Sequence, residues 1–387
     1  MRTPEEFDEI RPYDPEELPG VIEELVGDPE FRAAAEQVLP DIPYEKACGM
    51  LRGCHTNLEV QRTMFYPLLK NLLAKCSTHF ALEGTGNVDK TIPHTFITNH
   101  RDIVTDSAFL SVGLLDCGFG NTVEIAIGDN LLIRPWIKKL VRVDKAFIVQ
   151  RSAGLRQMLA SSTRLSRYMH YAVTVKQESI WIAQREGRAK DSNDRTQDAI
   201  LKMMAMGGEG GTVERLRQLN LTPIALSYEY DPCDYLKAQE FQQKRDIEGF
   251  KKSPADDLLN MQTGIFGYKG RICFRMAACL NPWLDTLPAN LPKASLFAAV
   301  AARIDHEIHK NYELYPGNYA AADLLNGTER FATHYTAEEK DRFENYLQGQ
   351  IRKVSLPHPD TDFLRERLLT MYANPVFNHE TACHEEE

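Results

Sequence analysis

A histidine and two aspartates lie close together in the segment FITNHRDIVTDSAFL, residues 96–110. A β-prone run ends at Thr98, and His100 follows in a turn before an apolar segment of helical length. A histidine at the carboxyl end of a strand, with carboxylates within two helical turns, is typical of a general base with an orienting acid. The two candidate acids are Asp102 and Asp106.

The same residues also fit a purely structural interpretation. His100 would then be a hydrogen-bonded histidine, and Asp102 would be the N-cap of the following helix. No serine-nucleophile motif accompanies His100, because GxSxG is absent from the chain. A catalytic His100 would therefore act directly on a hydroxyl of the substrate. Local residues alone leave both interpretations open.

Strands and helices must alternate to bring such a turn to the edge of a sheet. Helices are expected to begin near residues 103, 131, 154 and 195. β-prone runs separate them from about residue 78 onward: THFALEG, HTFITNH, VEIAIGD, AFIVQR, SIWIAQ, LTPIALSYEY and GRICFRMAACL. This alternation predicts an α/β fold with helices packed on the faces of a sheet.

Helical segments flank this α/β region on both sides. The first forty residues, from Met1 to about Pro40, are acidic and interrupted by prolines, and an apolar helix face follows in MFYPLLKNLLAKC. The chain after GRICFRMAACL is again helical in pattern. The expected division is a helical N-terminal extension over 1–76, an α/β domain over 77–285 and a helical C-terminal extension over 286–387.

Composition narrows the class of protein. A chain of 387 residues with 43% hydrophobic residues, 26% charged residues and a net charge of −10 is typical of a soluble globular protein and argues against a dedicated nucleic-acid binder. Eight cysteines without paired spacings predict free thiols in a reducing compartment. No apolar stretch approaches the ~20 residues that span a bilayer, and the N-terminus lacks the apolar core of a signal peptide. We therefore expect a cytoplasmic protein that does not cross a membrane.

Several other motifs are better explained as ordinary structure. GTGNVDKT (84–91) lacks the P-loop spacing, and GGEGG (207–211) suits a flexible connection between a helix and a strand. The HEIH sequence at 306–309 is one residue short of HExxH. We expect the chain end to be a frayed tail, although it carries His379, Cys383 and His384. No metal site is predicted.

Four short blocks in order strengthen the catalytic interpretation of His100. Together they resemble the glycerophospholipid acyltransferase family, which includes bacterial 1-acylglycerol-3-phosphate acyltransferases. That family carries an NH-x4-D block, an F-I-x-R-like block, an EG-x-R block and an apolar block with proline. The corresponding blocks here are Asn99-His100 with Asp106, AFIVQR at 146–151, REGR at 185–188 and LTPIA at 221–225. The resemblance covers about residues 78–230.

The chain departs from the family pattern at two places. Asp106 is the sixth residue after His100, whereas the family's aspartate is the fifth. Either the turn holds one more residue or Asp102 takes the partner's role, and we favour Asp106 because Asp102 suits a helix cap. The third block is one residue short, so either Arg188 or Arg185 can occupy the family's arginine position.

The resemblance implies a fold, a reaction and a set of roles. The fold is a mixed sheet flanked by helices, with helical extensions at both ends. The reaction transfers a fatty acyl group from a thioester, either acyl-CoA or acyl carrier protein, to a hydroxyl of a glycerophosphate-type lipid, without a metal or bound cofactor. His100 would take the hydroxyl proton, and Asp106 would orient and stabilise the imidazole. The implied acceptor site consists of Arg151, Glu186, Gly187 and Arg188, in which the arginines bind phosphate.

Three alternatives use the same residues. An O-acyltransferase of the same fold could act on an N-acyl amino acid and give an aminolipid, because arginines bind a carboxylate as well as a phosphate. A lipid-binding scaffold without catalysis would be favoured if His100 and its acidic partner were far apart. A thioesterase would result if His100 activated water instead of an alcohol.

The expected partners are the acyl donor, a lipid acceptor and a membrane surface. The segment LLIRPWIKKLVRVDKAF, residues 131–147, is basic and amphipathic and contains Trp136, as interfacial helices do. A surface helix packed on the sheet, or a docking site for an acidic carrier protein, would show the same pattern. We expect peripheral attachment to the inner face of the cell membrane and no nucleic-acid partner.

Overall fold

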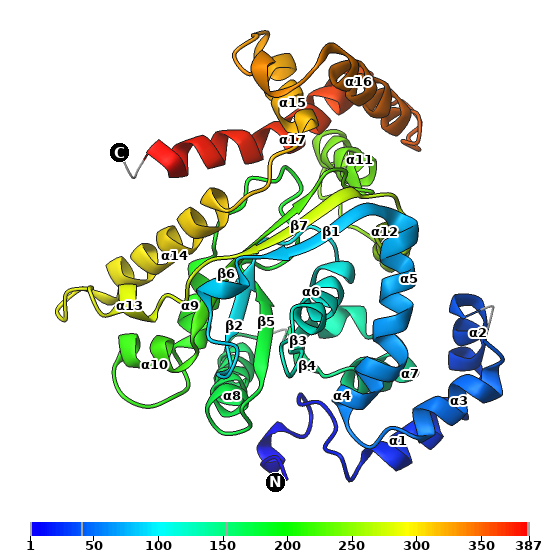
Figure 1. Cartoon of the computed structure of the whole chain (residues 1–387), viewed down its shortest axis with the longest axis vertical. Coiled ribbons are helices and arrows are strands. Elements are labelled where there is room, and N and C mark those ends of the chain that lie inside the picture. Colours follow the sequence, from blue (N-terminus) through cyan, green and yellow to red (C-terminus); the bar gives the residue numbers. More distant parts are fainter. Residues whose placement is uncertain (1, 40–41, 152–153, 385–387) are drawn as a thin grey trace.

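The computed structural model describes residues 2–39, 42–151 and 154–384, so Met1 and Pro40 of the N-terminal extension lie outside the described residues. Its seven strands form one sheet in the order β1-β7-β6-β2-β5-β3-β4 (Figure 1). They are β1 (Ser77–Glu83), β2 (Thr95–Thr98), β3 (Val123–Gly128), β4 (Ala146–Val149), β5 (Ser179–Ala183), β6 (Leu221–Tyr228) and β7 (Gly270–Met276). Each strand coincides with one of the seven β-prone runs, and the predicted α/β fold is confirmed.

The sheet is mixed, and its main part is parallel. Strands β6, β2, β5, β3 and β4 run in one direction, whereas β7 is antiparallel to β6 and β1 is parallel to β7. Thr98, the last residue of β2, pairs with Ala183 of β5 and Ile224 of β6. The carboxyl ends of five strands therefore meet at one edge, which is where α/β sheets place their ligands.

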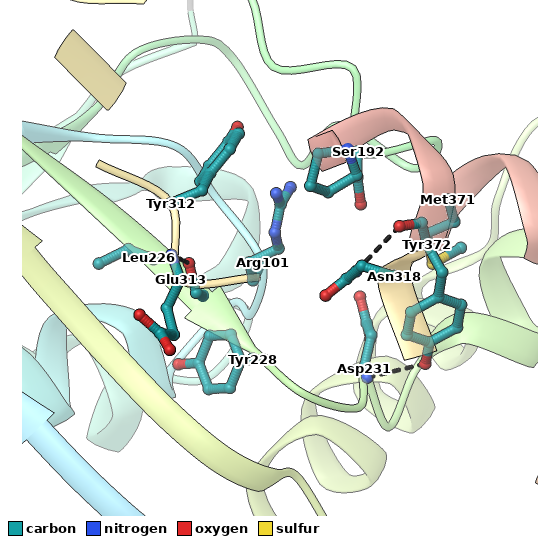
Figure 2. Close-up of a pocket in the computed structure, with 12 residues that line it drawn as sticks. Arg101, Ser192, Leu226, Tyr228, Asp231, Tyr312, Glu313, Asn318, Met371 and Tyr372 are labelled. Atoms are coloured by element: carbon teal, nitrogen blue, oxygen red, sulfur yellow. Dashed lines mark hydrogen bonds between the residues drawn. The ribbon is translucent and has the colours of Figure 1, made fainter. Parts of the chain in front are cut away.

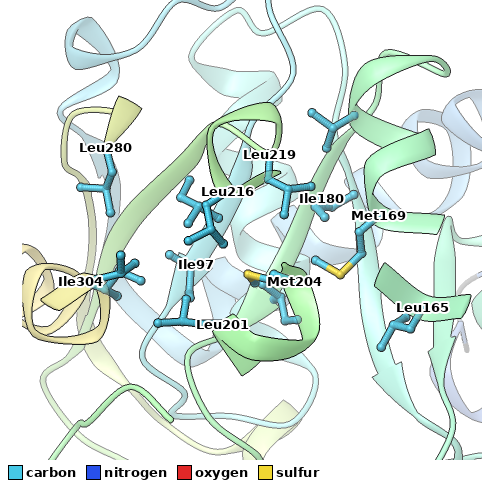
Figure 3. Packing of buried hydrophobic residues seen from close by; sticks show 14 of the residues in the cluster. Ile97, Leu165, Met169, Ile180, Leu201, Met204, Leu216, Leu219, Leu280 and Ile304 are labelled. Atoms are coloured by element: carbon cyan, nitrogen blue, oxygen red, sulfur yellow. The ribbon is translucent and has the colours of Figure 1, made fainter. Parts of the chain in front are cut away.

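Helices cover both faces of the sheet, and the central strands β2 and β6 are accordingly buried along their whole length. One face packs against α8 (Leu155–Thr174), α9 (Asp198–Met204) and α14 (Lys293–Lys310), where Met169, Leu201 and Ile304 meet Ile97 and Ile180 of the sheet (Figure 3). The other face packs against α5 (Tyr66–Cys76) and α6 (Thr105–Asp116). The remaining helices between strands are η3 (Thr85–Asn87), η4 (Asp129–Leu131), α7 (Pro135–Val143), α10 (Thr212–Gln218), α11 (Asp234–Asp246) and α12 (Pro254–Phe266).

The N-terminal residues form η1 (Glu5–Phe7), α1 (Leu18–Val26), α2 (Pro29–Val38), α3 (Tyr44–Arg52), α4 (Asn57–Val60) and η2 (Gln61–Phe65). Their first segment runs along the edge strand β4, where the backbone N–H of Ile148 donates to the carbonyl of Ile10 across 2.8 Å. This contact shields an otherwise open sheet edge. None of the helices in the described part of the chain is long and apolar enough to cross a bilayer.

The C-terminal residues form α13 (Asn281–Leu284), α14, α15 (Pro316–Asn326), η5 (Ala332–His334), α16 (Ala337–Ile351) and α17 (Thr361–His384). The expectation of a frayed tail is wrong, because α17 continues to His384 and buries an apolar stripe that includes Leu364, Leu368 and Tyr372. The expected division of the chain at residue 285 remains a prediction. Helix α14 lies beyond that limit and yet supplies part of the core that covers the sheet.

Candidate active site

The side chain of Asn99 joins the carboxyl ends of two neighbouring strands. Its Nδ2 donates to the carbonyl of Leu226 across 2.9 Å, and the N–H of Leu226 donates to its Oδ1 across 2.7 Å. Asn99 thus extends the ladder between β2 and β6 by one residue with its side chain. The loop that begins at His100 therefore leaves the sheet from a fixed point.

His100 and Asp106 form a hydrogen-bonded pair at the edge of the sheet. His100 Nδ1 lies 2.8 Å from Asp106 Oδ2, and because an ionised carboxylate only accepts hydrogen bonds, Nδ1 carries the proton. The ring packs edge-on against Trp181 of β5, with centroids 5.8 Å apart. Nε2 makes no hydrogen bond with any described residue, and 13% of the His100 side chain is exposed. Nε2 is therefore the nitrogen available to a substrate.

Four donors hold the carboxylate of Asp106, which is almost fully buried. Besides His100, Oδ2 accepts from the backbone N–H groups of Arg101 at 2.7 Å and Asp102 at 3.0 Å. Oδ1 accepts from the Tyr228 hydroxyl at 2.9 Å. Burial and the charge of Asp106 raise the pKa of Tyr228, which stays a donor. A carboxylate with this many donors is fixed in orientation and presents a stable anion to the imidazole.

Asp102 caps the helix that follows it. Its Oδ1 accepts from the N–H groups of Val104 at 2.9 Å and Thr105 at 2.7 Å, next to the first residues of α6. The loop of residues 100–104 curls around the Asp106 carboxylate, and this curl accommodates the additional residue between the histidine and its partner. Asp106 thus lies beside the imidazole, and Asp102 has the cap geometry.

The arginines of the REGR block lie partly inside the protein. Arg188 Nη2 donates to Asn260 Oδ1 of α12 across 2.9 Å, whereas its buried Nη1 has no partner among the described residues. Nε of Arg185 is likewise buried without a partner there. Burial raises the pKa of Asp231, but Lys237 and Arg188 outweigh it and hold that pKa below its usual range. Arg188 therefore keeps one donor without a partner among the described residues, close to the carboxylate of Asp231.

Arg151 and Glu186 lie at the surface and form an ion pair, with Arg151 Nη1 3.3 Å from Glu186 Oε1. The backbone N–H of Arg151 donates to the carboxylate of Asp129, which anchors it at the end of β3. Gly187 has a φ of +71°, a left-handed conformation that suits glycine and makes the sharp turn between Glu186 and Arg188. Two of the four predicted acceptor residues thus meet at the surface, while Arg188 turns toward α12.

Arg151 also lines an open cavity of about 670 Å³. The other lining residues come from the N-terminal segment, the ends of β3 and β4, and helix α8: Glu9, Asp129, Gln150, Gln157, Ala160, Ser161 and Arg164. Arg164 is paired with Glu9 across 2.8 Å. The cavity is wide enough for a polar headgroup and borders the second of the four blocks.

A buried polar network supports the His100 loop from behind, and it is invisible in the sequence pattern. Arg101 donates to Asp194 Oδ1 across 3.0 Å, Asp194 also accepts from the Tyr312 hydroxyl, and Lys237 donates to the Arg101 carbonyl across 3.2 Å. The one sequence feature that relates to this support is that Arg101 directly follows His100. The network comes from four segments that lie far apart in the sequence.

A small internal cavity of about 30 Å³ adjoins this network (Figure 2). Arg101, Tyr228, Asp231 and Tyr372 are among its lining residues, whereas His100 is not. Its volume is comparable to that of one water molecule. A lipid acceptor or a thioester cannot enter it, so this cavity is not a substrate pocket.

The basic segment at residues 131–147 contains α7, which packs within the protein. Trp136 and Leu140 lie against the cluster formed by the N-terminal helices. Arg134 pairs with Glu30 across 2.6 Å, and Lys139 pairs with Glu24 across 2.7 Å. This is the arrangement of a packed surface helix, and it leaves little of the apolar face of α7 free for a bilayer.

The HEIH sequence lies on α14, and its second histidine has another role. His309 Nε2 lies 2.8 Å from the carbonyl of Asp194, and burial lowers the pKa of His309 to about 4, which keeps the ring neutral. Across residues 2–39, 42–151 and 154–384, no group of three metal-ligating side chains is found.

Comparison with solved structures finds distant structural likeness. No protein-family model matches the chain, and no curated protein matches it. The crystal structure of the 1-acyl-sn-glycerophosphate (LPA) acyltransferase PlsC from Thermotoga maritima is similar with a TM-score of 0.38 and 10% sequence identity, over 78% of this chain and 100% of that chain. At these values the likeness concerns the course of the backbone and carries nothing about activity.

Proposed function

We propose that this protein is an acyltransferase that moves a fatty acyl group from an acyl thioester to a hydroxyl of a glycerophosphate-type lipid acceptor. The observation that carries the proposal is the pairing of His100 Nδ1 with the buried Asp106 at 2.8 Å, with Nε2 left without a partner among the described residues. A histidine in this arrangement has Nε2 free to accept a proton, and the carboxylate of Asp106 stabilises the imidazolium that then forms.

In the proposed reaction, His100 Nε2 takes the proton of the acceptor hydroxyl while that oxygen attacks the thioester carbonyl carbon. The C–O bond forms, the C–S bond breaks, and the proton passes from the imidazolium to the departing thiolate. Asp106 stays ionised and stabilises the imidazolium. General base catalysis of this kind contributes about 10²–10⁴-fold to the rate.

The acceptor's phosphate would bind to the arginines of the second and third blocks. The unused Nη1 of Arg188 and the guanidinium of Arg151 are the donors that we assign to it. Glu186 would hold Arg151 in place or accept a hydrogen bond from a hydroxyl of the acceptor. Gly187 would keep the turn between Glu186 and Arg188. Acyl-CoA and acyl carrier protein remain the two candidate donors.

The purified protein should be incubated with an acyl thioester and a panel of acceptors, and free thiol and acylated product should be measured. Thiol release that depends on a lysophosphatidic acid acceptor supports the proposal. Equal thiol release without any acceptor would point to a thioesterase, and product from an N-acyl amino acid alone would point to aminolipid synthesis. Binding of lipid without thiol release would indicate a lipid-binding scaffold without catalysis.

A further inference from the structure

Helix α12 carries three large apolar side chains outward. Leu258, Leu259 and Phe266 are 51%, 45% and 63% exposed, whereas its buried residues are Asn260 and Gly264. At about 100° per residue, the three apolar positions fall within an arc of about 100° on one side of the helix. A helix that is packed by its apolar face shows the opposite arrangement.

The inner face of α12 lies directly on the candidate active site. Asn260 accepts the hydrogen bond from Arg188, and Gly264 packs so closely on Asp102 that a β-carbon there would be 1.8 Å from Asp102 Oδ2. The backbone of Gly264 also accepts from the buried Lys269 across 2.6 Å. The outward apolar face is thus a surface of the same structural unit that holds the His100 loop.

The arc that holds these apolar side chains carries no charged residue, because Asp256 and Asp257 of the first turn lie outside it and are engaged by Ser253 and Lys252. Lys251, just before the helix, is exposed and makes no ion pair with a described residue, and Tyr268, just after it, is 53% exposed. Apolar side chains flanked by a lysine and an aromatic ring are typical of helices at the membrane interface, where the lysine meets anionic headgroups and the ring lies at headgroup depth. Arg134, just before α7, and Lys139 within it are by contrast already paired with glutamates.

We infer that α12 is the surface by which this protein docks on an anionic bilayer, with Leu258, Leu259 and Phe266 among the upper acyl chains. The inference rests on the proposed function in one respect, because a lipid acceptor is what requires the site to face a membrane. Docking through α12 brings the bilayer to the side of the protein where Arg188 and Asp102 lie.

The test is flotation with vesicles of phosphatidylethanolamine and phosphatidylglycerol. The triple variant Leu258→Ser, Leu259→Ser, Phe266→Ser should lose vesicle affinity at least about tenfold, since each buried leucine or phenylalanine side chain contributes that much or more. A matched control is Ile92→Ser with Val175→Ser, which removes two exposed apolar side chains just before β2 and β5, at the opposite edge of the sheet. The control should bind like the wild type. Absence of wild-type binding, or equal binding by the triple variant, overturns the inference.

A second readout separates this inference from the proposed function. The triple variant should keep wild-type transfer to a water-soluble, short-chain acceptor. If the wild type transfers an acyl group to no acceptor, but floats with the vesicles while the triple variant does not, the proposed function fails and the docking surface stands. If the triple variant floats normally and loses transfer to the soluble acceptor, the face holds a substrate chain or carrier protein and the inference fails. A change from dimer to monomer in the triple variant would assign the face to a second copy of the chain, against the inference.

Discussion

The hydroxyl of Tyr228 donates to the carboxylate of Asp106 across 2.9 Å, from the last residue of β6 to the first turn of α6. It occupies the oxygen of Asp106 that does not face His100. Both side chains are buried. The orientation of the acid in the proposed pair therefore depends on strand β6 as well as on its own loop.

Tyr228→Phe should lower kcat about tenfold with little change in either KM. Phenylalanine keeps the ring packing on Phe274, where the centroids are 5.9 Å apart, but leaves a buried carboxylate oxygen without its donor, which costs about 1–3 kcal/mol. Steady-state kinetics and thermal unfolding measure both effects. Tyr230→Phe is the control, because the Tyr230 hydroxyl makes no hydrogen bond with any described residue. Equal kcat in the wild type and Tyr228→Phe would contradict a role for this bond.

The two aspartates of the His100 loop should respond differently to substitution. His100→Ala should lower kcat about 10²-fold or more. Asp106→Asn should also lower kcat steeply, since an amide places a donor where the carboxylate now accepts from four groups. Asp102→Asn should be mild, because asparagine caps a helix about as well as aspartate. A severe loss in Asp102→Asn beside a mild one in Asp106→Asn would reverse the assignment, and full activity in His100→Ala would end the proposed mechanism.

Arg188→Ala and Arg151→Ala should raise the KM for a phosphorylated acceptor and leave kcat nearly unchanged, as expected when an interaction is equal in the ground and transition states. The rise should be larger for Arg188, which is partly buried, than for Arg151, which is exposed and already paired with Glu186. Arg342→Ala, on the remote helix α16, serves as the control. Unchanged acceptor KM in both variants would place the phosphate elsewhere.

Gly264→Ala should destabilise the protein and lower its activity, although alanine favours a helix over glycine by roughly 0.5–1 kcal/mol. The reason is the contact with Asp102, since the new β-carbon would be 1.8 Å from Oδ2 and must displace either the cap or α12. Gly349→Ala in α16 is a matched control with no atom within 4 Å of its β-carbon. Chemical denaturation should show a loss for the first variant and none for the second. Similar behaviour of both would mean that α12 is not held against Asp102.

The buried Asp234 should make stability depend on pH in the direction opposite to most aspartates. Burial raises the pKa of Asp234 to about 6, although the hydrogen bonds from Tyr346, Tyr372 and Gln350 act to lower that pKa. Between its ordinary value of 3.8 and about 6 the folded state binds more protons than the unfolded state, so this group's stabilisation is present at low pH and is lost as pH rises through 6. The shift corresponds to on the order of 3 kcal/mol.

Asp234→Asn lacks this titration and should gain stability relative to the wild type as pH rises from 4 to 6, with a constant difference above that range. Urea unfolding at several pH values measures the difference. A pH-independent difference for Asp234→Asn would show that this carboxyl does not titrate in that range.

Short-range patterns were sufficient for the strands, for the four helices expected between them and for the local geometry of the loop. Seven β-prone runs became seven strands, because a strand in a covered sheet is recognised by its own apolar residues. The cap role of Asp102 and the pairing of His100 with Asp106 both involve residues within a stretch of seven, residues 100–106. The frayed tail was mispredicted because the apolar stripe of α17 has a partner only in the folded chain.

The sequence by itself thus determined which segments form the strands, where four of the helices between them begin and which turn carries the histidine. Only the tertiary structure decided that Tyr228 holds Asp106, that Asp194 holds Arg101, and that α12 lies on Asp102 with its apolar face outward. The physical reason is that periodicity encodes which face of an element is buried, but not which distant element covers it. That choice depends on the order of the strands in the sheet, and contacts between residues about a hundred positions apart follow from it.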